Sequence, residues 1–181
     1  LRSHERRETY DAIAGELCDY GLQWGGALVD AKAFRCKAQR LSVYSMRYGD
    51  EVRIRPDLYR DFVLVHVSVR KGIEIETDGR IHHVPEGRVF FSSPKHSIAL
   101  RWQEHCEQVL IRVPHDLLFR GKSFQVPLSA TSLPEPLVVP FVHQLSALLA
   151  MARQPSDLYG FRQWQDALQE TLVGFVAASL G

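Results

Sequence analysis

The chain has 181 residues, 45% of them hydrophobic, and its 22 lysines and arginines nearly balance its 21 aspartates and glutamates. This length suits one compact domain with a small helical appendage. Domains that grip nucleic acid usually carry a basic excess on one face, so the balanced charge argues against direct DNA binding by this chain. The three cysteines, Cys18, Cys36 and Cys106, lack C-x-x-C spacing and fit a reduced protein better than a disulfide scaffold.

The first residues are polar and charged, which excludes a secretory signal. No apolar run approaches the roughly 18 residues that a membrane span needs. We therefore expect a cytoplasmic protein with no membrane contact. The sequence does not begin with methionine, so we also expect it to be part of a longer protein.

The first 40 residues predict a helix followed by a connector. Apolar residues recur at helical spacing within residues 8–20, and Gly21 follows as the expected C-cap. The pattern of residues 27–40 favours neither a helix nor a strand. We assign residues 1–40 to this N-terminal unit.

From residue 41 the apolar pattern changes to a period of two, which indicates strands. Residues 62–70 show it most clearly, because four valines alternate with Phe62, Leu64, His66, Ser68 and Arg70. One of these faces must belong to the core, and the other changes from apolar to polar along its length. Further strands are expected at residues 41–48, 73–77, 80–84, 88–92, 97–102 and 106–113.

Two turn signals separate these strands. Asp78-Gly79 predicts a two-residue hairpin, because the primed turn needs positive φ at both central positions. Pro85-Glu-Gly87 predicts the next turn. Short strands with such frequent turns indicate a sandwich or barrel, and the absence of a crossover helix disfavours a parallel sheet. The expected fold is therefore mostly β with C-terminal helices, and the barrel occupies residues 41–120.

Helical patterns return in residues 121–181. One apolar helical face runs from residue 141 to 152, and the last helix is expected at about residues 157–180. That helix carries one apolar stripe that includes Leu168 and Leu172, and a second apolar set that includes Val176. A helix that is apolar on two sides has two surfaces to cover, so either a partner subunit packs there or the helix has one broad buried face.

The order of these motifs resembles the effector-binding domain of AraC/XylS-type transcriptional regulators, in the branch with a cupin-like jelly-roll barrel. The resemblance covers residues 40–120 and is carried by Tyr48-Gly-Asp-Glu-Val52, Gly72, Asp78-Gly79, Pro85-Glu-Gly87, Ser93-Pro94, Trp102 and Cys106-Glu-Gln-Val-Leu-Ile-Arg-Val-Pro114. It implies that residues 121–181 form the linker and the antiparallel helices through which a bacterial regulator makes a homodimer. It also implies that DNA is bound only by a helix-turn-helix domain that would begin where this chain stops.

Metal sites in the cupins that this barrel resembles use a G-x5-H-x-H pattern and a further histidine after the P-x-G turn. Here Gly79-x5-Pro85-x-Gly87 leads to Phe90 at the place of that last ligand. His82 and His83 are adjacent, so they point to opposite faces of a strand and do not chelate one ion together. We therefore expect no metal, no other cofactor and no enzyme activity.

The remaining chemistry favours ligand binding. Arginine offers a planar fork that suits carboxylate or phosphate, although a solvated strand edge is the competing interpretation for each arginine. His66, Ser68 and Arg70 share one strand face, and Trp102 either stacks on a flat ring or belongs to the core. The candidate ligand-binding residues are Arg35, His66, Ser68, Arg70, Trp102 and Arg112.

The class of effector follows from the resemblance only in outline. The strand at Ser97-Ile-Ala-Leu100 implies an apolar lumen, which disfavours a sugar as the effector. Effectors of the family also include aromatic acids, fatty acids and cyclic dinucleotides. We expect an effector-sensing and dimerisation domain that binds a small anion, either an aromatic or amphiphilic one inside the barrel or a cyclic dinucleotide on its outer face. The alternative is a dimerisation or partner-protein module without a small-molecule effector, and a cupin-type enzyme is a third, disfavoured interpretation.

Overall fold

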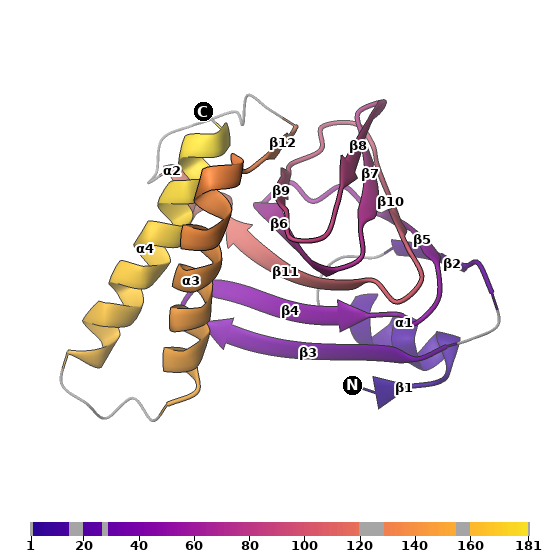
Figure 1. Cartoon of the computed structure of the whole chain (residues 1–181), viewed down its shortest axis with the longest axis horizontal. Helices are drawn as coiled ribbons and strands as arrows, with labels where there is room; N and C mark the ends of the chain where they lie inside the picture. Colours follow the sequence, from indigo (N-terminus) through magenta and orange to yellow (C-terminus); the bar gives the residue numbers. More distant parts are fainter. Residues whose placement is uncertain (1, 15–19, 27–28, 120–128, 155–159, 181) are drawn as a thin grey trace.

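The computed structural model describes residues 2–14, 20–26, 29–119, 129–154 and 160–180. Two antiparallel sheets face each other, and two long helices cover the outer side of the larger sheet (Figure 1). The larger sheet has the strand order β1 (Arg2–Ser3), β3 (Ala31–Ala38), β4 (Leu41–Arg47), β11 (Glu107–Pro114), β6 (Phe62–Arg70), β9 (Val89–Ser92) and β12 (Ala130–Ser132). The smaller sheet has the order β2 (Tyr20–Trp24), β5 (Val52–Pro56), β10 (Ile98–Trp102), β7 (Ile73–Thr77) and β8 (Arg80–Val84).

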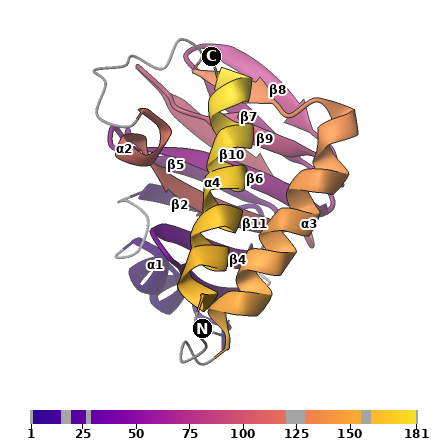
Figure 2. The same ribbon diagram turned by 90° about the vertical axis from the view of Figure 1, so that its left-hand side faces the viewer.

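Four helices complete the described fold: α1 (Arg6–Ala14), α2 (His115–Phe119), α3 (Glu135–Ala152) and α4 (Phe161–Leu180). Figure 2 shows α3 and α4 side by side in front of the larger sheet. The mostly β fold with C-terminal helices is thus confirmed.

Strand β6 is buried on both faces because it lies in the middle layer of the fold. Phe62 and Leu64 belong to the core between the two sheets, whereas Val63, Val65 and Val67 belong to the core between the larger sheet and the helices. The alternation was predicted from the sequence, and the structure shows that both faces are core. A strand covered on both sides reads as a nearly continuous apolar run.

The two long helices are fixed to the sheet by apolar and polar contacts. On α3, Phe141 and Leu148 are buried, and Phe141 meets Phe175 of α4 edge-on with 5.7 Å between ring centres. On α4, the buried Gln169 side chain accepts a hydrogen bond of 2.9 Å from the Arg40 backbone N–H, in the turn between β3 and β4. This polar contact holds α4 in register against the end of the sheet.

The hairpin between β7 and β8 has the predicted turn, with φ of 50° at Asp78 and 79° at Gly79. The Asp78 carboxylate also accepts hydrogen bonds from the backbone N–H groups of Lys95, His96 and Ser97, at 2.7 to 3.2 Å. Burial by itself would raise the pKa of this carboxyl, but these donors outweigh burial, and the pKa lies below its usual value. Asp78 therefore ties the hairpin to the segment that leads into β10.

The N-terminal unit differs from the prediction. The helix α1 ends at Ala14, residues 15–19 lie outside the described part, and Gly21 belongs to strand β2 and does not cap a helix. Strand β3 pairs with β4, so the sheets extend beyond the predicted boundary at residue 41. Strands β2 and β3 have many exposed or half-buried residues, so their apolar alternation is weak in the sequence.

The helix α3 is strongly apolar. It is the one helix of the described residues that is long and apolar enough, by length and composition, to cross a membrane, with a mean hydropathy of 1.3. Phe141, Leu145 and Leu148 cover one side of it against the sheet. Leu137 and Val139 are 40% and 61% exposed, so apolar residues also face outward from this helix.

Candidate functional site

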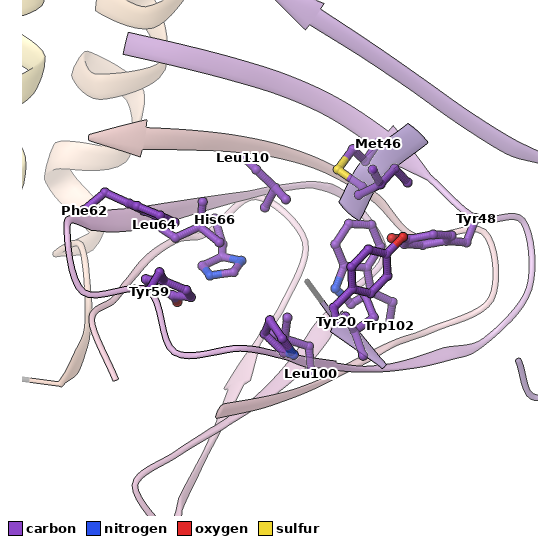
Figure 3. A pocket seen from close by; sticks show the side chains of 13 residues that line it. Tyr20, Met46, Tyr48, Tyr59, Phe62, Leu64, His66, Leu100, Trp102 and Leu110 are labelled. Carbon is purple, nitrogen blue, oxygen red and sulfur yellow. The ribbon is translucent and has the colours of Figure 1, made fainter. Parts of the chain in front are cut away.

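A cavity lies between the two sheets, inside the barrel (Figure 3). His66 and Leu110 reach it from the larger sheet, and Leu100 and Trp102 reach it from the smaller sheet. Ile13 of α1 also lines it, so the N-terminal helix forms part of its wall. The other lining residues are Tyr20, Met46, Tyr48, Ile54, Pro56, Tyr59, Phe62 and Leu64.

A buried hydrogen-bonded chain ends at the cavity. The Tyr59 hydroxyl bonds to the Ser92 hydroxyl, which lies 2.9 Å from His66 Nε2. His66 is completely buried, and burial lowers its pKa to about 3, so its imidazole is neutral at physiological pH. The other ring nitrogen, Nδ1, has no hydrogen-bond partner among the described residues.

Trp102 supplies a second orphaned polar group on the opposite wall. Its side chain is 1% exposed, and its indole N–H has no acceptor among the described residues. The ring packs edge-on against Tyr48, with 5.2 Å between ring centres. Leaving a buried donor unpaired costs about 1–3 kcal/mol, so a ligand that supplies an acceptor here recovers part of that cost.

The cavity is small, at about 40 Å³. A water molecule needs roughly 10–15 Å³ of such space, whereas an engineered cavity that binds benzene measures about 150 Å³. A few water molecules therefore fit the cavity as it stands. A ring-sized ligand enters only when lining side chains move.

The predicted site residues do not form one cluster. His66 and Trp102 line the same cavity. Ser68 is buried but bonds to the Lys71 carbonyl and to the Gln108 amide, and it does not line the cavity. Arg70 is exposed at the end of β6, so strand parity did not place it beside His66 in space.

The other two predicted arginines lie outside the cavity lining. Arg35 is exposed on β3, opposite Tyr44. Arg112 is half-buried on β11, and its guanidinium carbon lies 4.4 Å from the centre of the Phe62 ring. Phe62 lines the cavity, so Arg112 contacts a lining residue without belonging to the lining itself.

Tyr59 and Ser92 complete the polar chain to His66, and neither was predicted from the sequence. Ser92 follows two phenylalanines at the end of β9, and the pairing of β9 with β6 brings it next to His66. Tyr59 precedes β6 in a segment without strand pattern. Only the three-dimensional pairing joins these residues, and the one available signal was a polar residue in an otherwise apolar strand.

The histidine pair on β8 is divided as predicted. His82 packs against Phe90 inside, with 5.1 Å between ring centres, and His83 lies outside beside Glu74 at 3.4 Å. Phe90 is 1% exposed and fills the space where the resemblance places a metal ligand. Among the described residues, no three His, Cys, Asp or Glu side chains come close enough together to hold a metal ion.

The outer face of the smaller sheet carries most of the charge near the barrel. Arg53, Arg55 and Arg101 line an open depression of about 290 Å³ together with Glu74 and Glu76. Arg101 is already paired there, since it makes two hydrogen bonds of 3.0 Å with the Glu51 carboxylate. A second depression of about 550 Å³ lies beside it over Gly72, His83 and Gln103.

The helices α3 and α4 present exposed apolar and small residues to solvent. Trp164 of α4 is 69% exposed, and it is followed at alternating steps of three and four residues by the exposed Ala167, Thr171, Gly174 and Ala178. Leu172 and Val176, by contrast, are buried against the sheet. The sequence left open whether a partner subunit or one broad buried face accounts for the two apolar sets of this helix. In the structure, Leu172, Val173 and Val176 share one broad buried face.

Comparisons with known proteins identify a family and similar solved structures. The family model of the AraC-binding-like domain matches residues 9–176. The crystal structure of the AraC-like transcriptional activator CuxR superposes with a TM-score of 0.75 at 15% identity, covering 99% of this chain and 68% of that chain. An RmlC-like cupin protein from Desulfovibrio desulfuricans gives a TM-score of 0.39 at 12% identity over 46% of this chain and 81% of its own. No curated protein sequence matches. This chain belongs to the AraC-binding-like domain family.

Proposed function

We propose that this chain is the effector-sensing and dimerisation domain of a bacterial, cytoplasmic AraC-type transcription regulator, and that it acts by binding and not by catalysis. DNA recognition then belongs to a separate helix-turn-helix domain of the same protein. The observation that carries the proposal is the barrel cavity, in which His66 Nδ1 and the Trp102 indole N–H are buried and have no hydrogen-bond partner within the described part of the chain. A polar atom left unpaired in an apolar cavity is one that a ligand can complement.

The small size of the cavity supports a sensing role. A ring-sized effector must displace part of the wall, so binding is coupled to a change in conformation. A ligand shifts a two-state balance only by its differential affinity for the two states, and a cavity that is closed in one state and open in the other provides that difference. The balance would set how two DNA-binding domains approach their half-sites.

Calorimetry against a panel of aromatic acids, fatty acids, cyclic dinucleotides and neutral aromatic compounds tests the proposal. Replacing Leu100, which lines the cavity, by Phe should abolish the heat of a lumenal effector while the protein stays folded. The matched control is Ile81→Phe, because Ile81 is 57% exposed on β8 and away from the lining. Binding that survives Leu100→Phe, or a folded protein that binds no member of the panel, would contradict the lumenal site.

An anionic effector such as a cyclic dinucleotide would bind to the outer face of the smaller sheet and not inside the barrel. Its phosphates suit the outer face, where Arg53 and Arg55 line the 290 Å³ depression. Glu74 and Glu76 line the same depression and oppose an anion. Arg53→Ala combined with Arg55→Ala should abolish binding of an outer-face anion and leave a lumenal ligand unaffected.

The second candidate function is a dimerisation or partner-protein module without a small-molecule effector. The observation in its favour is that side chains of the barrel fill most of the lumen and leave only about 40 Å³. The same calorimetric panel discriminates between the two functions, because this candidate predicts no heat from any small molecule.

We also propose that α3 and α4 form the homodimer contact, with a second copy of this chain as the occupant of their exposed faces. Leu137, Val139 and Trp164 are the large apolar residues exposed there, and Leu172 and Val176 are already covered within one protomer. Val139→Glu should therefore yield monomers in sedimentation velocity, while Ile81→Glu, at a position of similar exposure on β8, should not. A dimer that withstands both Val139→Glu and Ala167→Glu would place the interface elsewhere.

A further inference from the structure

We propose that the barrel cavity admits only an uncharged ligand, and that this ligand presents a hydrogen-bond acceptor to the indole N–H of Trp102. The inference rests on the proposed function and narrows it, because it excludes anions from the lumen. It also changes the expectation from the sequence, which placed an aromatic or amphiphilic anion inside the barrel.

The first reason is that the described residues of the cavity wall carry no countercharge. None of the 13 lining residues is an aspartate, glutamate, lysine or arginine. A carboxylate inside this wall loses its hydration and meets no cation in return, and burial of an unpaired charge is strongly unfavourable. The titratable residues in the lining are Tyr20, Tyr48, Tyr59 and His66.

The second reason is that His66 does not supply the missing cation. Its Nε2 bonds to the Ser92 hydroxyl, its ring is completely buried, and no acidic side chain in the described part of the chain lines the cavity to stabilise an imidazolium. Burial holds its pKa at about 3, so the ring is neutral where a carboxylate ligand is ionised.

The third reason is the position of Arg112. Its guanidinium lies 4.4 Å from the centre of the Phe62 ring, and Arg112 itself is not part of the lining. Phe62 and Tyr59 stack with 4.6 Å between ring centres and both line the cavity, so Arg112 contacts the lining through an aromatic face and not through an ion pair. An anionic head group that reached Arg112 would lie outside the lumen.

The polar atoms of the lumen define what an uncharged ligand must offer. The Trp102 indole is a donor only, so it requires an acceptor such as a hydroxyl or carbonyl oxygen. His66 Nδ1 donates or accepts according to its tautomer, so it adapts to either group. A neutral aromatic alcohol, amide or ketone meets both requirements.

Three probes of similar size test the inference: benzyl alcohol, toluene and benzoic acid. Binding is followed by the NMR resonance of the Trp102 indole N–H, which Trp102→Phe identifies. Benzyl alcohol should bind with an affinity that does not vary between pH 5.5 and 7.5. The apparent affinity of benzoic acid should fall about tenfold per pH unit over this range, because only its uncharged form enters. Trp102→Phe lacks this resonance, so its affinities are measured by calorimetry. The substitution should weaken benzyl alcohol by about 5- to 10-fold and toluene by less than about 2-fold, as expected for the loss of one hydrogen bond.

The outcomes separate the inference from the function on which it rests. Benzoate that shifts the Trp102 resonance with a pH-independent affinity overturns the inference and leaves the sensing role intact. Loss of that benzoate binding in Arg112→Met would assign the anion to the rim of the barrel. A Trp102 resonance that none of the three probes shifts overturns both the inference and the lumenal site of the proposed function.

Discussion

Replacing His66 by glutamine should remove a large part of the sensitivity of this domain to mild acid. The His66 pKa is about 3 in the folded state and close to 6.5 when the ring is solvated. Between these values the unfolded chain binds a proton that the folded protein does not bind, so stability falls as the pH drops below 6.5. Glutamine does not titrate, and its side-chain amide can keep the hydrogen bond to the Ser92 hydroxyl.

The size of the effect follows from the two pKa values. The difference between 6.5 and about 3 corresponds to about 5 kcal/mol in total, at about 1.4 kcal/mol per pH unit. From pH 7 to pH 5 the His66 contribution to the free energy of unfolding should fall by about 2 kcal/mol. The full stability is present above pH 6.5, and the loss is complete only near pH 3.

Urea unfolding followed by circular dichroism at pH 7, 6 and 5 measures this difference. Carboxylates titrate alike in the wild type and the variant, so the wild type should lose about 2 kcal/mol more than His66→Gln over this range. His143→Gln, at an exposed position on α3, is the control and should follow the wild type. Parallel pH profiles for the wild type and His66→Gln would show that the buried imidazole is not held neutral. The second reason for an uncharged ligand would then be wrong.

Three further outcomes are expected. Asp78→Ala removes the acceptor of three backbone N–H groups and should lower the free energy of unfolding by about 1–3 kcal/mol, with faster hydrogen exchange at His96 and Ser97. Leu148→Ala, in the core under α3, should cost about 2–5 kcal/mol in urea unfolding. In a Cys18→Ser background, Cys106 should react with a thiol reagent only after unfolding, because it is 2% exposed and burial raises its pKa to about 11, whereas the half-buried Cys36 should react in the folded protein.

The parts of the fold that the sequence predicted are those encoded by neighbouring residues. The Asp78-Gly79 turn and the alternation in β6 depend on local backbone geometry and on burial of a whole strand face. Strands β2 and β3 were not predicted, because strands with mixed exposure carry little apolar alternation. Gly21 was read as a helix cap for the same reason, since a glycine after an apolar stretch marks a helix end as readily as an exposed strand position.

The candidate site shows the same division. The alternation along β6 suggested His66, and the flat aromatic ring suggested Trp102. Both residues face the space between the sheets. Parity does not say how far along a strand the cavity extends, so it grouped Ser68 and Arg70 with His66 although neither lines the cavity. Ser92 and Tyr59 depend on strand pairing and chain path, which no local pattern records.

The cavity wall that yields to a ligand determines how binding reaches the rest of the molecule. Strand β6 carries Leu64 and His66 on the cavity side and Val63 and Val65 on the helix side, so a shift of β6 would move the packing of α3 and α4 directly. However, β6 pairs with β11 along one edge and with β9 along the other, and moving it would break both ladders.

Helix α1, by contrast, belongs to neither ladder. Ile13 is its one residue in the cavity lining, Tyr10 packs against Tyr20 with 5.0 Å between ring centres, and Arg6 contacts the Gly26 carbonyl and the Trp24 ring. We therefore expect a ring-sized effector to displace α1 first. Hydrogen exchange measured with and without bound effector should become faster in residues 6–14 and stay unchanged in β6. Unchanged exchange in α1 together with faster exchange in β6 would show that the ligand acts on the dimerisation helices through the strand itself.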